Sequence, residues 1–256
     1  MRKLTGCIVV LALASPQLQA GCVAQSTADR PHLVELYTAE GCASCPPAER
    51  WMSSLRASKD YIGLEFHVDY FDVQGWRDPF ADPRYTLRQK ALTKHGSQDE
   101  HFSKTSLIYT PQVIVDGRLW KNWPKAAPPD VGTAAAPALS LDVTPGSPIR
   151  VKVASLSDTT PLPSYRFFVA LSENGLTSAV KAGENRGKRL EHDLVVRDLV
   201  GPLDLPQAEA QLKPPTGFDI SKAAVVAFVQ DEKSGDIVQA LRLPLAQCTP
   251  SLSPSR

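Results

Sequence analysis

The sequence has little net charge, since its 256 residues include 28 lysines and arginines against 27 aspartates and glutamates. It also lacks any basic run with interleaved aromatic residues, so nucleic acid is not an expected partner. Beyond residue 20, no apolar run approaches the roughly 20 residues needed to cross a bilayer, so no transmembrane segment is expected there. Hydrophobic residues make up 43% and charged residues 21%, which excludes bulk disorder and indicates a globular chain.

Cysteine is also scarce, with five residues, too few for a disulfide scaffold. One of them, Cys7, lies in a short apolar run that follows Arg2 and Lys3 and precedes Leu18-Gln19-Ala20. A basic start, a short apolar stretch and a small-residue exit predict a signal peptide over residues 1–20, and hence a secreted or periplasmic protein. Its removal leaves an even number of cysteines, as expected where disulfides form.

The first of these cysteines, Cys22, has two possible fates. The string Leu18-Gln19-Ala20-Gly21-Cys22 fits a lipoprotein signal in which Cys22 is acylated and anchors an envelope lipoprotein. Alternatively, Cys22 pairs with Cys248, because both lie near a chain end and domain termini tend to be close together. The sequence favours the disulfide slightly, since Gln19 stands where such signals normally carry leucine.

Apolar patterning predicts an α/β domain over residues 30–122. Strands are expected at 32–37 and 62–68, and the helix opened by Pro46 has an apolar face. A second helix is expected over 82–94, and Asp116-Gly117 predicts a hairpin between the apolar runs on either side. Residues 69–81 are expected to form an inserted loop or lid.

Residues 123–148 are rich in proline and alanine and are interpreted as a linker. The stretch 149–247 then contains short runs rich in β-branched and aromatic residues, which predict a mainly antiparallel, sandwich-like β domain. The expected strands are 149–154, 165–171, 190–196, 223–230 and 237–243.

The chemistry of the sequence centres on Cys42-Ala43-Ser44-Cys45, which lies between the first strand and the helix opened by Pro46. A helix N-terminus favours a thiolate, and two intervening residues allow the sulfurs to meet. We therefore expect Cys42 to be the exposed attacking thiolate and Cys45 the buried resolving thiol. The expected partners are protein thiols or small thiols, and no cofactor is needed.

Three other interpretations of this motif remain. Secreted proteins commonly carry structural disulfides, so the pair could only brace a non-catalytic binding module. A zinc site is disfavoured because the histidines show no ligand spacing, and no metal is therefore expected; they are His32, His67, His95, His101 and His192. A copper-binding or copper-chaperone protein would use Cys42, Cys45 and His67 as ligands.

The order strand, Cys-x-x-Cys helix, strand, helix and then Tyr109-Thr110-Pro111 before a hairpin resembles the thioredoxin fold. The resemblance implies that Pro111 is a cis-proline facing the disulfide and that the backbone at Thr110 pairs with the substrate. It also implies that Glu35 is a buried acid accepting the proton of the resolving cysteine. An exposed edge glutamate is the alternative for Glu35.

Longer strings resemble the secreted thioredoxin-like family catalogued as domain of unknown function 1223, over about residues 32–247. The matching strings are 34–48, 66–72, 75–80, 88–89, 184–187 and 192–197. Because that family has no settled activity, the resemblance implies a fold more than a function. Its members usually carry a helix after the hairpin, which Pro124, Pro128 and Pro129 should shorten or remove here.

Tyr70 and Trp76 in the inserted loop are candidates for a substrate-recognition surface beside Cys42. The alternative is internal packing of the loop, with Trp76 and Phe80 filling a small core of their own. For residues 184–187 a turn is expected rather than a binding loop, and His192 is expected to be a partly buried histidine with satisfied hydrogen bonds.

Overall fold

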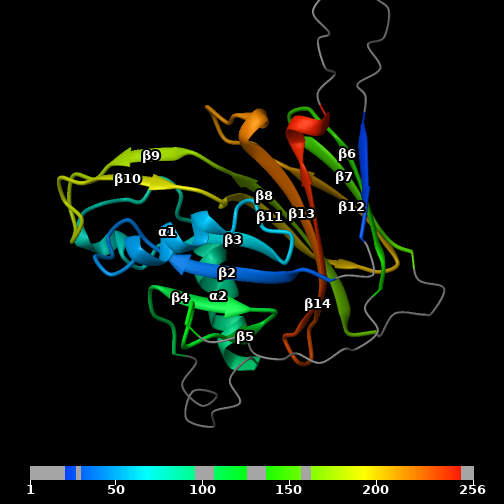
Figure 1. The fold of residues 1–256 in the computed structure, drawn as a ribbon, viewed down its shortest axis with the longest axis horizontal. Coiled ribbons are helices and arrows are strands. Elements are labelled where there is room, and N and C mark those ends of the chain that lie inside the picture. Colours follow the sequence, from blue (N-terminus) through cyan, green and yellow to red (C-terminus); the bar gives the residue numbers. More distant parts are fainter. Residues whose placement is uncertain (1–20, 27–29, 96–106, 126–136, 157–162, 249–256) are drawn as a thin grey trace, which may run out of the picture.

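The computed structural model describes residues 21–26, 30–95, 107–125, 137–156 and 163–248 (Figure 1). The predicted signal peptide at 1–20 lies outside the described residues. Within the described part of the chain, no helix is long and apolar enough to span a membrane.

An eight-stranded mixed sheet runs through the molecule in the order β14-β13-β8-β11-β3-β2-β4-β5. Its first-half strands are β2 (His32–Thr38), β3 (Tyr61–His67), β4 (Gln112–Val115) and β5 (Arg118–Leu119). Its second-half strands are β8 (Tyr165–Glu173), β11 (Val195–Asp204), β13 (Ala223–Asp231) and β14 (Ile237–Pro244). The halves join where Val195 of β11 pairs in parallel with Glu65 of β3. One sheet therefore connects the two segments that the sequence assigns to separate domains, and that division remains a prediction.

Two helices cover opposite faces of β2 because its apolar residues alternate between the faces. Val34 and Leu36 share a core with Met52 of α1 (Pro46–Ser54). Leu33 and Tyr37 share another core with residues of α2 (Pro83–His95). The chain runs from β2 through residues 39–45 into α1, so the beginning of α1 lies beyond the carboxyl end of β2.

A second, four-stranded antiparallel sheet has the order β1-β6-β7-β12. Its strands are β1 (Cys22–Gln25), β6 (Leu139–Thr144), β7 (Ile149–Ser155) and β12 (Gln207–Leu212). Alternate residues of β6, β7 and β12 share one apolar core with β8 and β13 of the large sheet. The mixed α/β architecture, mostly strand and with a small antiparallel sheet, is thus confirmed.

Some elements differ from the sequence-based expectations. Strand β6 lies inside the predicted linker, where the alternating Leu139, Leu141 and Val143 are buried in the core. The expected strand 190–196 is divided into β10 (Arg189–His192) and β11, because Leu194 adopts a left-handed conformation with φ of 60°. Strand β10 instead forms a two-stranded hairpin with β9 (Leu176–Ala179). Short 3-10 helices occupy Asp72–Gln74, Ile220–Lys222 and Leu245–Cys248.

The predicted disulfide between Cys22 and Cys248 is present, with the two Cα atoms 5.2 Å apart. It joins β1 to the short 3-10 helix Leu245–Cys248 that follows β14. Both cysteines contact the core between the sheets. A sulfur in a disulfide cannot also carry a lipid, so the structure favours this bridge over acylation of Cys22.

His32 at the start of β2 makes a pH-dependent contribution to stability. Its Nδ1 lies 2.6 Å from Asp116 Oδ2, and this hydrogen bond raises the pKa of His32 despite partial burial and the nearby Arg30, with Asp60 adding to the rise. Because the pKa of His32 is higher in the folded protein than its ordinary value of 6.5, protonated His32 stabilises the fold at pH values below 6.5. This contribution is lost as the pH rises through the pKa of the folded state. We expect urea unfolding to show a larger deficit for His32→Gln at pH 5.5 than at pH 9, whereas an equal deficit would contradict this assignment.

Candidate redox site and its buried polar surroundings

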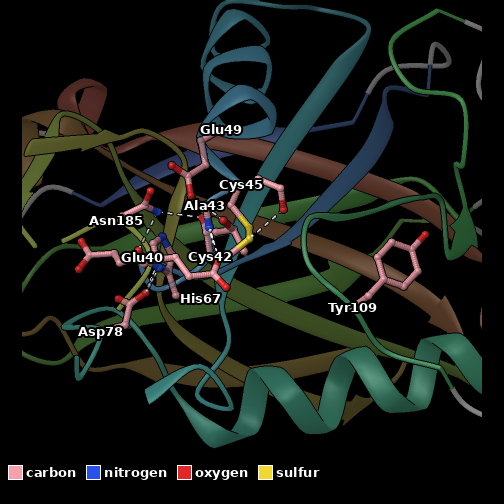
Figure 2. The surroundings of a disulfide bond; sticks show 12 residues. Glu40, Cys42, Ala43, Cys45, Glu49, His67, Asp78, Tyr109 and Asn185 are labelled. Carbon is pink, nitrogen blue, oxygen red and sulfur yellow. Dashed lines mark hydrogen bonds and ion pairs between the residues drawn. A yellow bond between two sulfur atoms is a disulfide. The ribbon is translucent and has the colours of Figure 1, made fainter. Parts of the chain in front are cut away.

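Cys42 and Cys45 form a disulfide at the junction between β2 and α1, with an S–S distance of 2.08 Å (Figure 2). Cys45 is the N-cap residue of α1 and Pro46 occupies the first helical turn, where a missing N–H has no consequence. The Cys45 carbonyl accepts the N–H groups of Ala48 and Glu49. The motif therefore lies at the partly positive end of a regular helix.

The prediction that Cys42 is exposed is wrong for the disulfide form, in which 1% of Cys42 and none of Cys45 is accessible. The loop between β9 and β10, residues 180–188, lies over the backbone of the motif and leaves Ala43 and Ser44 exposed. Asn185 Nδ2 donates to the carbonyls of Glu40 and Cys42 at 2.9 and 2.8 Å. The N–H of Ala43 donates to Glu184 Oε2 at 2.8 Å. Residues expected to form a simple turn thus hold the backbone of the Cys-x-x-Cys motif.

We expect Asn185→Ala to accelerate reduction of the Cys42–Cys45 disulfide by dithiothreitol. The variant loses two hydrogen bonds, each worth about 1 kcal/mol, so opening of loop 180–188 should become more frequent by roughly tenfold or more. The rate is measured by alkylation and mass spectrometry after timed quenching. Glu191→Ala on the exposed side of β10 is the matched control and should react like the wild type. Equal rates for Asn185→Ala and wild type would show that the loop does not limit access.

Pro111 and Thr110 lie immediately before β4, at the end of the sheet where the motif begins. Gln112 pairs with Tyr37, one residue before the end of β2. The Thr110–Pro111 peptide bond is cis, as the thioredoxin resemblance implies. Thr110 Oγ1 is buried and makes no hydrogen bond with the described residues. The roles of Pro111 in catalysis and of Thr110 in substrate binding remain predictions.

Glu35 is buried, with 1% of the residue exposed, so the alternative of an exposed edge glutamate is wrong. Its two carboxylate oxygens accept hydrogen bonds from Arg88 Nε and Nη2 of α2, both at 2.7 Å. Tyr37 donates a further hydrogen bond to Glu35. The charge partner of Glu35 in this structure is therefore Arg88, and its role as proton acceptor for Cys45 remains a prediction.

Tyr70 and Trp76 make contacts inside the protein. The Tyr70 hydroxyl lies 3.4 Å from Gln89 Oε1, and burial raises the pKa of Tyr70 to about 12. Trp76 Nε1 donates to Glu40 Oε2 at 2.6 Å. These contacts fit the internal-packing alternative for the inserted loop, and a substrate-binding role for either residue remains a prediction.

Beneath the motif, the structure gathers a buried cluster of two histidines and four carboxylates. None of its members is more than 3% exposed; they are Glu40, Glu49, Glu65, His67, Asp78 and His192. Glu40 lies two residues before Cys42, and Glu49 lies one helical turn after Cys45 (Figure 2). His192 comes from β10, so this cluster connects the Cys-x-x-Cys helix to the hairpin that covers it.

Both histidines are hydrogen-bonded to carboxylates. His67 Nδ1 lies 2.7 Å from Asp78 Oδ2, and His192 Nε2 lies 3.1 Å from Glu40 Oε1. Burial opposes charge on His67, but Asp78 and Glu65 raise its pKa to about 10. Burial likewise opposes charge on His192, whose pKa the surrounding glutamates raise to about 12. The carboxylates therefore strongly favour a positive charge within the buried cluster.

Sequence analysis did not find this cluster, because its members come from five separate segments of the chain. One local signal was present, since Glu65 and His67 interrupt an otherwise apolar strand. A charged residue rarely lies in a buried strand unless it is paired. The partners themselves, Glu40, Glu49 and His192, carry no such signal in the sequence.

Two solved structures are similar in fold to this protein. Protein AGR_C_4864 from Agrobacterium tumefaciens is similar in structure with a TM-score of 0.57 and 24% identity, over 85% of this chain and 96% of that one. HBP35 of Porphyromonas gingivalis is similar with a TM-score of 0.59 and 14% identity, over 90% of this chain and 80% of that one. At these identities the likeness shows the fold alone. No curated protein matches the sequence.

The two disulfides indicate an extracellular or periplasmic protein, because such bonds persist in oxidising compartments. The model of the family described as "Protein of unknown function (DUF1223)" matches residues 33–230, which include the motif, the inserted loop, the covering hairpin and the buried cluster. With most of its length matched, the chain belongs to the DUF1223 family.

Proposed function

We propose that this protein is a secreted or periplasmic thioredoxin-like thiol–disulfide oxidoreductase that uses Cys42 and Cys45. The observation that carries the proposal is the disulfide between these residues at the N-terminus of α1, directly after a central strand. The partial positive charge of a helix N-terminus stabilises a thiolate there, and a thiolate is both the nucleophile and the better leaving group in exchange. The middle residues of the motif, Ala43 and Ser44, are exposed to a partner.

The exchange proceeds in two balanced steps. In the oxidised protein, a substrate thiolate attacks Sγ of Cys42, forms a mixed disulfide and releases the thiolate of Cys45. A second substrate thiolate then attacks the substrate sulfur of the mixed disulfide, and Cys42 leaves as a thiolate, so that the substrate is oxidised and the pair is reduced. In the opposite direction, Cys42 attacks a substrate disulfide and Cys45 resolves the mixed disulfide.

The substrates of this reaction are protein thiols or small thiols. Loop 180–188 is proposed to move when a thiol reaches Cys42, since Asn185 and Glu184 bind the backbone of the motif and 1% of Cys42 is accessible in the oxidised form. Thr110, in the segment before β4, is proposed to offer its backbone to a bound peptide, with Pro111 fixing the conformation of that segment.

The proposal is tested by trapping. We expect Cys45→Ser to accumulate mixed disulfides through Cys42 in the cell envelope, because the resolving thiol is missing. These adducts are detected by non-reducing electrophoresis and mass spectrometry. Cys42→Ser is the matched control and should trap much less. If Cys45→Ser captures neither proteins nor small thiols while Cys42 stays alkylatable, the exchange proposal is wrong.

A second candidate is a non-catalytic binding module whose Cys42–Cys45 disulfide only braces the fold. The 1% exposure of Cys42 favours this candidate. A structural pair resists alkylation after mild reduction of the folded protein, whereas an exchange pair yields one reactive thiol at Cys42.

A further inference from the structure

The buried cluster has the ligand arrangement of a metal site. Donor atoms of Glu65, His67 and His192 all lie within 4.8 Å of one another. His67 Nε2 lies 3.1 Å from Glu65 Oε1, and His192 Nδ1 lies 3.5 Å from the same oxygen. Glu49 Oε2 is also 3.5 Å from His192 Nδ1, so a further carboxylate lies beside this group of three donors. Two ligands of a tetrahedral ion with bonds of 2.0–2.2 Å lie about 3.3–3.6 Å apart, so the 3.5 Å separation fits this geometry and the 3.1 Å separation is slightly shorter.

The outer hydrogen bonds of the two histidines point to the same conclusion. Asp78 accepts from Nδ1 of His67, and Glu40 accepts from Nε2 of His192. Each carboxylate thereby places a proton on the outer nitrogen and turns the lone pair of the other nitrogen toward the centre of the cluster. Carboxylates commonly hold metal-binding histidines in this way. The arrangement occurs twice here, on strands distant in sequence.

The inner atoms are left without sufficient partners by the protein. Glu65 Oε2 and His192 Nδ1 are fully buried and make no hydrogen bond with any described residue. A protonated imidazole has two N–H donors, and the acceptors nearest to His192 Nδ1, Glu49 Oε2 and Glu65 Oε1, are both 3.5 Å away, which is long for a hydrogen bond. A cation at the centre would instead bind this nitrogen and offset the buried carboxylate charge. The site is therefore better matched by a metal ion than by an imidazolium ion.

We propose that Glu65, His67 and His192 bind one divalent transition-metal ion, with Zn²⁺ as the best match to two imidazole nitrogens and a carboxylate oxygen. All three ligands are buried, and the carboxylate of Glu49 lies beside His192. The ion would link β3 to β10, and so fasten the covering hairpin to the strand that pairs with β2. This inference does not depend on the redox activity of the cysteines.

Metal content of the full-length protein tests the proposal. The protein is produced in zinc-supplemented medium, purified without chelators and analysed by inductively coupled plasma mass spectrometry. We expect about one zinc per chain in the wild type and at least tenfold less in the double variant His67→Gln/His192→Gln. His32→Gln, which alters a histidine outside the cluster, should keep its zinc. X-ray absorption should show nitrogen and oxygen ligands without sulfur.

Two further variants keep the outcome clear if the double variant fails to fold. Asp78→Asn leaves the proposed ligands in place, alters the outer partner of His67, and should weaken zinc binding by about 10- to 100-fold in a chelator competition. Cys42→Ser/Cys45→Ser should retain the metal. Absence of stoichiometric zinc from the folded wild type would overturn the proposal. So would sulfur ligation, loss of the metal with the cysteines, or unchanged affinity in Asp78→Asn.

Discussion

Replacing Arg88 with methionine is expected to destabilise the protein by about 3–5 kcal/mol, because it leaves the charge of Glu35 buried and unpaired. Both side chains are almost inaccessible, at 7% for Arg88 and 1% for Glu35. The burial of Arg88 opposes its charge, and the charge of Glu35 holds the pKa of the guanidinium above its ordinary value. The expected loss is measured as the difference in unfolding free energy from urea denaturation at neutral pH.

Arg88 also holds the two halves of the chain together. Its guanidinium lies 5.0 Å from the ring centroids of both Phe168 on β8 and Phe228 on β13. Its Nη1 donates to Gln230 Oε1 at 3.2 Å. One α2 side chain therefore connects β2 with strands of the second half, which explains why so large a loss is expected from one substitution.

Two variants control this prediction. Arg118→Met removes a partly exposed ion pair with Asp236 and should lower stability by no more than about 1 kcal/mol. The double variant Glu35→Gln/Arg88→Met removes both buried charges and should recover part of the loss. A loss below about 1 kcal/mol for Arg88→Met, or no recovery in the double variant, would contradict the assigned pairing.

Removing the Cys22–Cys248 disulfide is expected to lower stability by about 5 kcal/mol, the largest single effect predicted here. The sequence separation of 226 residues sets this value, because the entropy lost by closing a loop in the unfolded chain grows with the logarithm of its length. The double variant Cys22→Ala/Cys248→Ala avoids free thiols, and its unfolding free energy is compared with that of the wild type.

The Cys42–Cys45 disulfide is the internal comparison. It spans a sequence separation of 3, for which the same relation gives about 2 kcal/mol. Cys42→Ala/Cys45→Ala should therefore be distinctly more stable than Cys22→Ala/Cys248→Ala. The reverse order would show that the terminal bridge does not act as a long-range constraint.

The sequence predicts well those features that depend on residues close together in the chain. The alternating residues of β2, the prolines that open α1 and α2, and the turn at Asp116-Gly117 each identify their element locally. The Cys22–Cys248 pairing was also within reach, because termini tend to lie together.

The missing features depend on long-range contacts. Strand β9 alternates only partly buried and exposed residues, and β12 buries only Ala210 and Leu212, so neither shows a strong apolar pattern. The carbonyl of Cys42 accepts a hydrogen bond from Asn185, which is 143 residues away in sequence. His192 and Glu40 meet across 152 residues, and spacing rules for metal ligands detect only neighbours. Residues of this kind become visible only when the strands are placed side by side.

The most direct test of the exchange function is the redox equilibrium of the Cys42–Cys45 pair in the folded protein. The protein is equilibrated in glutathione and dithiothreitol buffers, alkylated at acid pH and analysed by mass spectrometry, which separates this pair from Cys22–Cys248. The proposed function predicts a potential above about −300 mV for Cys42–Cys45, a lower potential for Cys22–Cys248, and alkylation of the reduced motif at Cys42 before Cys45. A potential below about −300 mV together with two unreactive thiols at Cys42 and Cys45 would contradict it and assign the pair a purely structural role.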